Sequence, residues 1–125
     1  LARELDNRAD PAGVPQEILV QVNCSNEPQK GGVEPGELPA LLDTLRDLSR
    51  LSVRGLMTMA AIDAGNPEQH RTFGLLRCLR DAAAGRGHQL PELSMGMSGD
   101  YPVAVEEGAT MVRLGTVLFG ERPHD

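Results

Sequence analysis

The residues best suited to chemistry lie in one stretch, residues 93–120, with the sequence LSMGMSGDYPVAVEEGATMVRLGTVLFG. Two short apolar runs, 93–97 and 111–118, flank a segment with the features of a helix. Small residues follow the first run and interrupt the second: Ser98, Gly99, Gly115 and Thr116. In α/β proteins, ligands bind at the carboxyl ends of parallel strands, and small residues there expose N–H groups that suit a phosphate. The pattern therefore predicts a phosphate site.

Three further residues of this stretch have roles that the sequence leaves open. Arg113 is a charge within an apolar run, so it faces a polar cavity, makes a structural ion pair, or lies at an exposed edge. Ser94 shares a strand face with Ser98 by the period of two, and it lines the interior or bonds to core backbone. Met95 and Met97 are expected on the opposite face, or to take part through their main chain only.

These residues resemble those of a known family. SMGMS followed by Asp100, and then ATMVRLGTVLFGER, is similar to the pyridoxal-phosphate homeostasis proteins, which are relatives of the alanine racemase barrel. Further matches lie upstream in the same order: ILVQVN, a downstream KGG, and VRGLMTM at residues 53–59. The resemblance therefore covers nearly the whole chain.

The resemblance implies an α/β fold, a parallel (β/α) barrel of the alanine-racemase type. A complete barrel takes about 250 residues, so this chain of 125 residues is expected to be about its carboxyl-terminal half. Apolar periodicity agrees, because it predicts four βα units after a partial first helix. The expected strands are 18–22, 53–59, 93–97 and 111–118, and the expected helices are 38–48, 66–84 and 101–107. We expect one domain, residues 1–125, and no second one.

Cap residues mark two of the expected helix starts. Asn66 is followed by Pro67 and Gln69, which predicts Asn66 as the amino-terminal cap and Gln69 in the capping box. Asp100 is a suitable cap for the helix at 101–107.

The resemblance also implies a role for each site residue. It implies that pyridoxal 5'-phosphate is held at the barrel mouth through its phosphate, by Ser98, the backbone around Met97, Gly115 and Thr116. Arg113 then faces the pyridine nitrogen, where its charge disfavours protonation and weakens the ring as an electron sink.

The lysine that binds the cofactor covalently in this family lies on the first barrel strand, in the half that this sequence lacks. Lys30 is the only lysine here, in the polar loop at 23–36. It either contacts cofactor or substrate, or is a solvated loop residue. A Schiff base needs a desolvated amine on a rigid strand, so we expect binding by this chain to be noncovalent and weak, or absent.

Three functions remain open, and we favour the first. It is a pyridoxal-phosphate binding protein of homeostasis, without enzymatic turnover. The second is a pyridoxal-phosphate-dependent racemase-like enzyme; such relatives need an additional β domain and a catalytic tyrosine, whereas Tyr101 is the only tyrosine here and lies at a helix start. The third is a phosphate-binding α/β module unrelated to this cofactor. This sequence lacks the GxGxxG or P-loop motif that such a module would be expected to carry.

Composition and charge exclude some classes of binding partner. A net charge of −6 and a pI near 5.0 argue against nucleic acid and anionic membranes. No apolar run approaches the roughly 18 residues of a membrane span, and we expect a cytoplasmic protein. Cys24 and Cys78 lack CxxC spacing and are expected to be reduced and buried, while His70 and His88 are expected on solvated surfaces, without metal.

A half-barrel leaves two strand edges unpaired. Such edges invite pairing with another strand. We therefore expect either a homodimer or association with a missing amino-terminal half-barrel.

Overall fold

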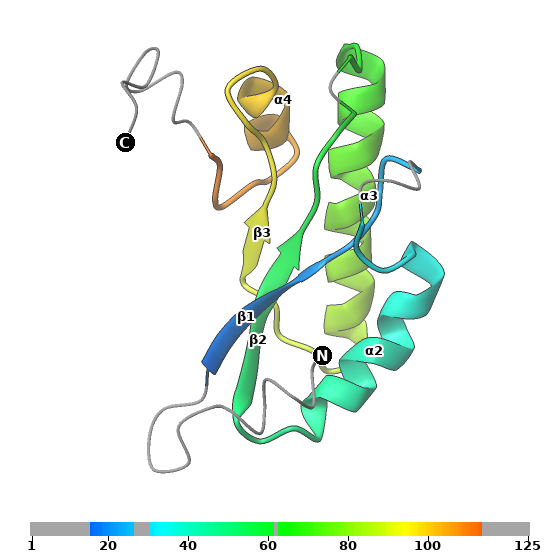
Figure 1. The fold of residues 1–125 in the computed structure, drawn as a ribbon, viewed down its shortest axis with the longest axis vertical. Helices are drawn as coiled ribbons and strands as arrows, with labels where there is room; N and C mark the ends of the chain where they lie inside the picture. Colours follow the sequence, from blue (N-terminus) through cyan, green and yellow to red (C-terminus); the bar gives the residue numbers. More distant parts are fainter. Residues whose placement is uncertain (1–15, 27–30, 62, 114–125) are drawn as a thin grey trace.

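A computed structural model describes residues 16–26, 31–61 and 63–113 (Figure 1). Three strands form one parallel sheet in the order β1-β2-β3: β1 (Gln16–Gln21), β2 (Leu51–Met57) and β3 (Glu92–Ser94). The short helix η2 (Pro35–Glu37) and α2 (Leu38–Arg46) join β1 to β2, α3 (Asn66–Gly85) joins β2 to β3, and α4 (Tyr101–Glu106) follows β3. The predicted α/β fold with parallel strands is confirmed.

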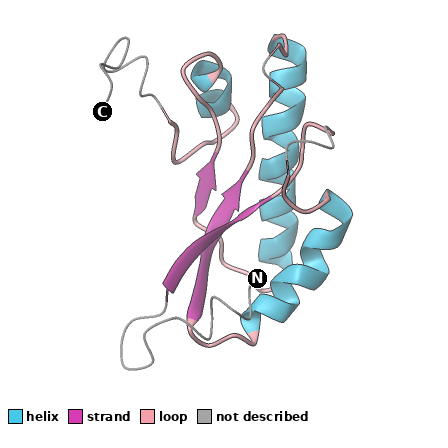
Figure 2. Cartoon of the chain, viewed as in Figure 1, coloured by secondary structure: helices cyan, strands magenta, loops and turns pink. Residues whose placement is uncertain are grey.

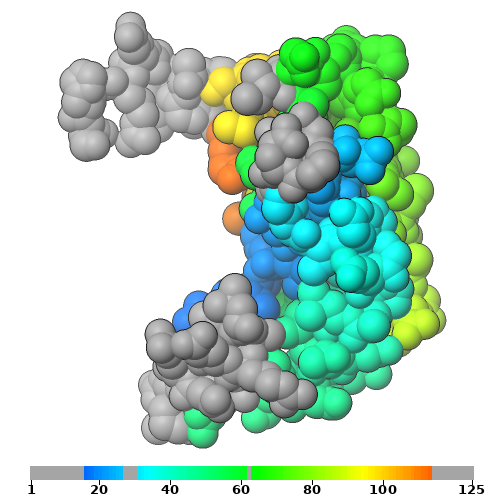
Figure 3. Space-filling model, turned by 45° about the vertical axis from the view of Figure 1, so that its right-hand side comes forward, coloured from blue at the N-terminus to red at the C-terminus, as the bar shows by residue number. Residues whose placement is uncertain are grey.

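Helices α2 and α3 cover one face of the sheet (Figure 2). The space-filling view shows α2, in cyan to teal, against the green α3, with the blue β1 beside them (Figure 3). Strand residues that share a row of the sheet share a face, and the row Val20, Leu56 and Leu93 points into this layer. All three are buried against helix residues such as Phe73 and Leu76. Each side chain of this kind contributes roughly 1.5–3 kcal/mol by leaving water.

The opposite face of the sheet carries no helix in the part of the chain that the structure describes. The next row along the strands, Gln21, Met57, Ser94 and Met111, points to this open face. Met111 is 43% exposed. A hollow of about 230 Å³ lies on the same side and is lined partly by Leu19 and Met111. Apolar side chains are therefore left facing solvent where a closed barrel would have its interior.

Most predicted elements are confirmed with shifted ends, and the third strand is shorter than predicted. It ends at Ser94 rather than at Met97, because the chain turns at Gly96, which has φ of +103°. Of the fourth predicted strand, 111–118, only its first three residues are described, with Met111 in a parallel bridge to Ser94. The partial first helix, at residues 1–9, lies outside the described residues.

Two local predictions about α3 need correction. Gly65, not Asn66, is the amino-terminal cap, and Asn66 is the first helical residue. The side chain of Gln69 donates to the carbonyl oxygen of Ala64 at 3.0 Å, so it secures the preceding loop instead of closing a capping box.

The prediction that both thiols are buried is correct for Cys24 and wrong for Cys78, which is exposed on α3.

His70 and His88 differ in their surroundings. His70 lies at the surface, as predicted, with its Nδ1 2.8 Å from a carboxylate oxygen of Glu107. The prediction is wrong for His88, which is only 8% exposed. The loop after α3 folds back against α2, so the His88 ring lies 3.0 Å from Asp43 Oδ1 and 3.0 Å from Arg46 Nη2. The hydrogen bond between His88 and Asp43 holds the pKa of the Asp43 carboxyl below its usual value.

No described helix combines the length and the apolar composition that crossing a membrane requires.

Candidate functional site

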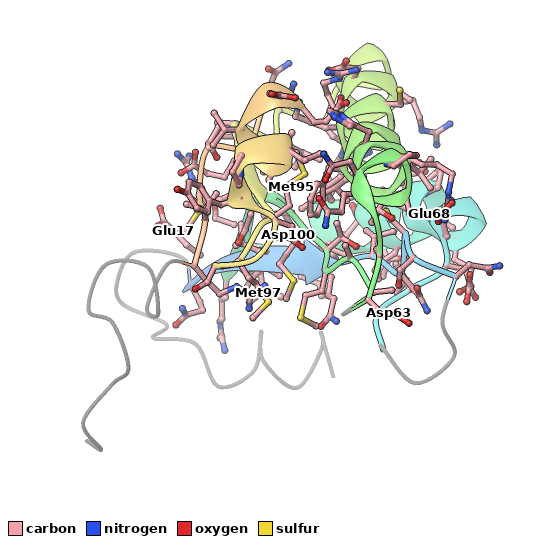
Figure 4. All side chains as sticks on the ribbon, turned by 90° about the horizontal axis from the view of Figure 1, so that it is seen from above. Glu17, Asp63, Glu68, Met95, Met97 and Asp100 are labelled. Carbon is pink, nitrogen blue, oxygen red and sulfur yellow. The ribbon has the colours of Figure 1, made fainter. Side chains whose placement is uncertain are left out.

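The candidate site lies at the carboxyl end of β3, where the chain turns into α4 (Figure 4). Gly96 makes this arrangement possible. A Cβ atom at Gly96 would lie 2.7 Å from the Cβ of Ala104, closer than two carbon atoms can approach. A positive φ also favours glycine. Gly96 therefore lets α4 pack directly on the strand end, a role that the sequence analysis did not assign.

The turn at residues 97–101 is closed by hydrogen bonds in both directions. The carbonyl oxygen of Met97 accepts from the N–H of Asp100 at 3.2 Å and from the N–H of Tyr101 at 2.9 Å. The N–H of Met97 donates to Asp100 Oδ1 at 2.7 Å. Asp100 thus occupies the cap position of α4 as predicted, yet its carboxylate makes no cap hydrogen bond. The carboxylate holds the main chain of Met97 instead.

The tip of this turn presents free hydrogen-bond donors. Among the residues that the structure describes, nothing accepts a hydrogen bond from the N–H of Ser98 or Gly99. The space around Gly99 is open, since a Cβ built there would meet nothing within 4 Å. Two successive unpaired N–H groups beside small residues are the arrangement that binds oxyanions.

The segment after α4 runs back alongside this turn. Thr110 anchors its start, because its hydroxyl oxygen accepts from the N–H of Leu93 at 2.8 Å. Farther along, the N–H of Arg113 donates to the carbonyl oxygen of Gly96 at 3.0 Å. The Arg113 side chain is exposed, and no described residue forms an ion pair with it. Arg113 is therefore held by its main chain next to the turn, with its guanidinium available.

The structure brings four of the predicted site residues to this end of the sheet: Ser94, Met97, Ser98 and Arg113. Gly115, Thr116 and Lys30 lie outside the described residues. Met95 points into the core, as expected, but Met97 does not share its environment and is 47% exposed. The turn at Gly96 breaks the strand alternation between them. Figure 4 shows Met95 toward the helices and Met97 on the other side.

A second ion-pair cluster fixes α4 against α3. Glu107 follows the last residue of α4, and its side chain is only 16% exposed. Its two carboxylate oxygens lie 2.8 Å from His70 Nδ1 and 2.9 Å from Arg77 Nη1, both on α3. Glu106 makes a longer contact, 3.5 Å, with the other ring nitrogen of His70. Glu107 therefore anchors α4, the helix that follows the turn at residues 97–101, to α3.

Thr58 links the carboxyl ends of β1 and β2 through hydrogen bonds of its side chain. Its buried hydroxyl donates to the carbonyl oxygen of Val22 at 2.7 Å and accepts from the N–H of Cys24 at 3.4 Å. Burial raises the pKa of the Cys24 thiol to about 11, so the thiol stays protonated at neutral pH. A threonine at the end of an apolar strand was the only sequence signal for this network.

Fold and site together define a class of protein. The family model described as "Alanine racemase, N-terminal domain" matches residues 1–123, and the chain belongs to this family. An alanine racemase from Corynebacterium glutamicum shares the fold, with a TM-score of 0.74, at 20% identity over 98% of this chain and 34% of that one. The predicted fold type is confirmed.

Within this class, the chain is similar to pyridoxal phosphate homeostasis proteins, which confirms the resemblance. The one from Aquifex aeolicus is 47% identical over 126 residues, covering 99% of this chain and 55% of the relative. The one from Escherichia coli K12 is 38% identical, covering 99% and 53%. PipY of Synechococcus elongatus, solved with pyridoxal phosphate bound, superposes with a TM-score of 0.81 at 36% identity, covering 95% and 56%. The chain thus spans about half the length of the curated relatives it matches.

Proposed function

We propose that this chain binds pyridoxal 5'-phosphate, within a protein that maintains the supply of that cofactor. The observation that carries the proposal is the turn at residues 97–101. Its unpaired N–H groups of Ser98 and Gly99 lie beside the segment that bears Arg113. PipY, which has the same fold and is 36% identical, was solved with this ligand and supports the choice of cofactor.

The phosphate fits the tip of the turn. The N–H groups of Ser98 and Gly99 donate to it, with the Ser98 hydroxyl, and the open space around Gly99 leaves room for the oxygens. Gly115 and Thr116 complete this cradle in the proposal. The N–H of Met97 already has Asp100 as its acceptor, so Met97 contributes the shape of the turn and not a donor.

Arg113 is assigned to the pyridine ring. Its guanidinium has no carboxylate partner among the described residues, so it is available to face the ring nitrogen. A permanent positive charge there disfavours protonation of that nitrogen. When bound, the cofactor supplies an electron sink, which an unprotonated ring makes weak. Ser94, buried in the open-face row of the sheet, lines the interior below. This arrangement suits holding the cofactor, and we assign no catalytic residue.

Binding by this chain is noncovalent in our proposal. Lys30 is its only lysine and belongs to the polar stretch 23–36 of the sequence, outside the run expected to form a strand. A lysine that forms a Schiff base needs a desolvated amine on a rigid element. The covalent attachment of the family therefore has no counterpart in these 125 residues.

A complementary half-barrel closes the open sheet face, either from the same longer polypeptide or from a second copy. Two observations support this: Met111 leaves 43% of its surface exposed on that face, and PipY is nearly twice as long as the part matched here. An uncovered apolar face beside open strand edges favours association.

The full chain can be titrated with pyridoxal 5'-phosphate and followed by the cofactor's absorbance and by calorimetry. We expect saturable binding that inorganic phosphate competes away. Treatment with borohydride followed by mass spectrometry should leave the protein mass unchanged. A pyridoxyl adduct on Lys30, or no saturable binding at all, would contradict the proposal.

A further inference from the structure

We propose that Asp100 is a positioning residue for phosphate binding: its carboxylate holds the turn at residues 97–101 in the shape that leaves the N–H groups of Ser98 and Gly99 free. This inference rests on the proposed function. It concerns a residue that touches the turn and not the ligand.

The hydrogen bonds of the turn support this role. Asp100 Oδ1 accepts from the N–H of Met97 at 2.7 Å, a length typical of a hydrogen bond to a charged acceptor. The carbonyl oxygen of the same residue, Met97, receives the N–H groups of Asp100 and Tyr101. Both polar groups of Met97 are thus fixed from the far side of the turn. The two peptide groups between them, those of Ser98 and Gly99, are forced to the tip.

The Asp100 side chain does not act by capping the first turn of α4. A capping carboxylate accepts from N–H groups in the first turn of the helix. The Asp100 side chain makes no such bond to α4. In the part of the chain that the structure covers, its single polar contact is the N–H of Met97, which precedes the helix.

Charge alone predicts the opposite effect on the ligand. A carboxylate near a phosphate repels it, so removing the carboxylate should strengthen binding if Asp100 acted only through its charge. If Asp100 holds the turn, its removal should weaken binding. The sign of the change therefore separates the two roles.

Three variants of the full chain test the inference. Asp100→Ala removes both charge and hydrogen bond, whereas Asp100→Asn removes the charge and keeps an oxygen that can accept from Met97. Asp63→Asn is the matched control, because Asp63 is an exposed carboxylate at the same end of the sheet without a polar contact among the described residues (Figure 4). The probes are pyridoxal 5'-phosphate and pyridoxal, which lacks the phosphate.

We expect Asp100→Ala to bind pyridoxal 5'-phosphate about tenfold more weakly, the effect of losing one charge-assisted hydrogen bond. Its binding of pyridoxal should be unchanged, since the proposed function assigns the ring to Arg113 and not to this turn. Asp100→Asn should bind within about twofold of the parent chain, because its amide oxygen still accepts. Asp63→Asn should bind as the parent chain does, or slightly tighter.

Equal or tighter binding of pyridoxal 5'-phosphate by Asp100→Ala would overturn the inference, and so would an equal loss for both probes. A parent chain that binds neither probe would instead contradict the proposed function. In that case, the amide resonances of Ser98 and Gly99 in Asp100→Ala still decide the question. We expect them to shift and broaden, and unchanged resonances would show that the carboxylate does not hold the turn.

Discussion

At the scale of single residues, Arg113 and Asp100 are expected to act on different ends of one ligand. Arg113 is assigned to the ring, so Arg113→Gln should weaken binding of pyridoxal 5'-phosphate and of pyridoxal alike. Loss of one such contact costs about 1 kcal/mol, or roughly fivefold in affinity. Calorimetric titration with both ligands measures it. Arg54→Gln removes an exposed arginine of β2 and serves as the control. A loss confined to the phosphorylated ligand would contradict the assignment.

The two cysteines should differ in reactivity. Burial raises the pKa of Cys24 to about 11, whereas Cys78 is exposed on α3. Only the thiolate reacts, so at pH 8 a thiol reagent should modify Cys78 rapidly and Cys24 only after unfolding. Because the folded pKa of Cys24 lies above its ordinary value of 9.0, its contribution to stability is complete below pH 9 and declines from there toward pH 11. Peptide mapping after timed labelling measures both rates, and equal rates would contradict the burial.

At the scale of the elements, α4 depends on its ion pairs with α3. Glu107 is mostly buried, and its carboxylate oxygens contact the His70 ring and the Arg77 guanidinium, so Glu107→Gln should destabilise the fold by about 1–2 kcal/mol. Glu106, its neighbour, is 68% exposed and makes one long contact. Glu106→Gln should therefore cost less than about 0.5 kcal/mol. Urea unfolding of the two variants compares them, and equal losses would argue against the role given to Glu107.

Most of the helices and strands could be predicted from the sequence. Apolar residues at helical spacing located α2 and α3, and short apolar runs located β1 and β2. These signals are local, and burial against the opposing layer follows from them. The end of β3 could not be predicted, because Gly96 turns the chain in response to α4, an element later in the sequence. The burial of His88 depends on α2 and was missed for the same reason.

The site was predictable to a similar degree. Ser98 and Arg113 were recognised from a motif, and in the structure the N–H of Arg113 donates to the carbonyl oxygen of Gly96, two residues before Ser98. The contact of Asp100 with Met97 could not be predicted, because aspartate before a helix usually caps it. Sequence spacing identifies residues that can meet, whereas the conformation of the turn decides which N–H group donates to the Asp100 carboxylate.

At the scale of the whole molecule, the open sheet face should make the chain associate. The face carries Met57 and Met111 and adjoins the edge of β1 opposite β2, along which no other strand of the described residues runs. Covering it with a second copy removes apolar surface from water and pairs the strand edges. Light scattering on the purified chain should therefore give more than its own 13.4 kDa, with twice that mass as the simplest result. A monodisperse monomer at micromolar concentration would contradict this expectation.

The central claim is that the phosphate of pyridoxal 5'-phosphate lies on the amides of Ser98 and Gly99, with its ring toward Arg113. Amide chemical shifts recorded during a titration with the cofactor test this most directly, because each backbone N–H reports its own hydrogen bond. We expect the largest shifts to fall on Ser98 and Gly99, and we expect inorganic phosphate to reproduce them while pyridoxal does not. Shifts that fall elsewhere in the sheet, or none at saturating cofactor, would contradict it.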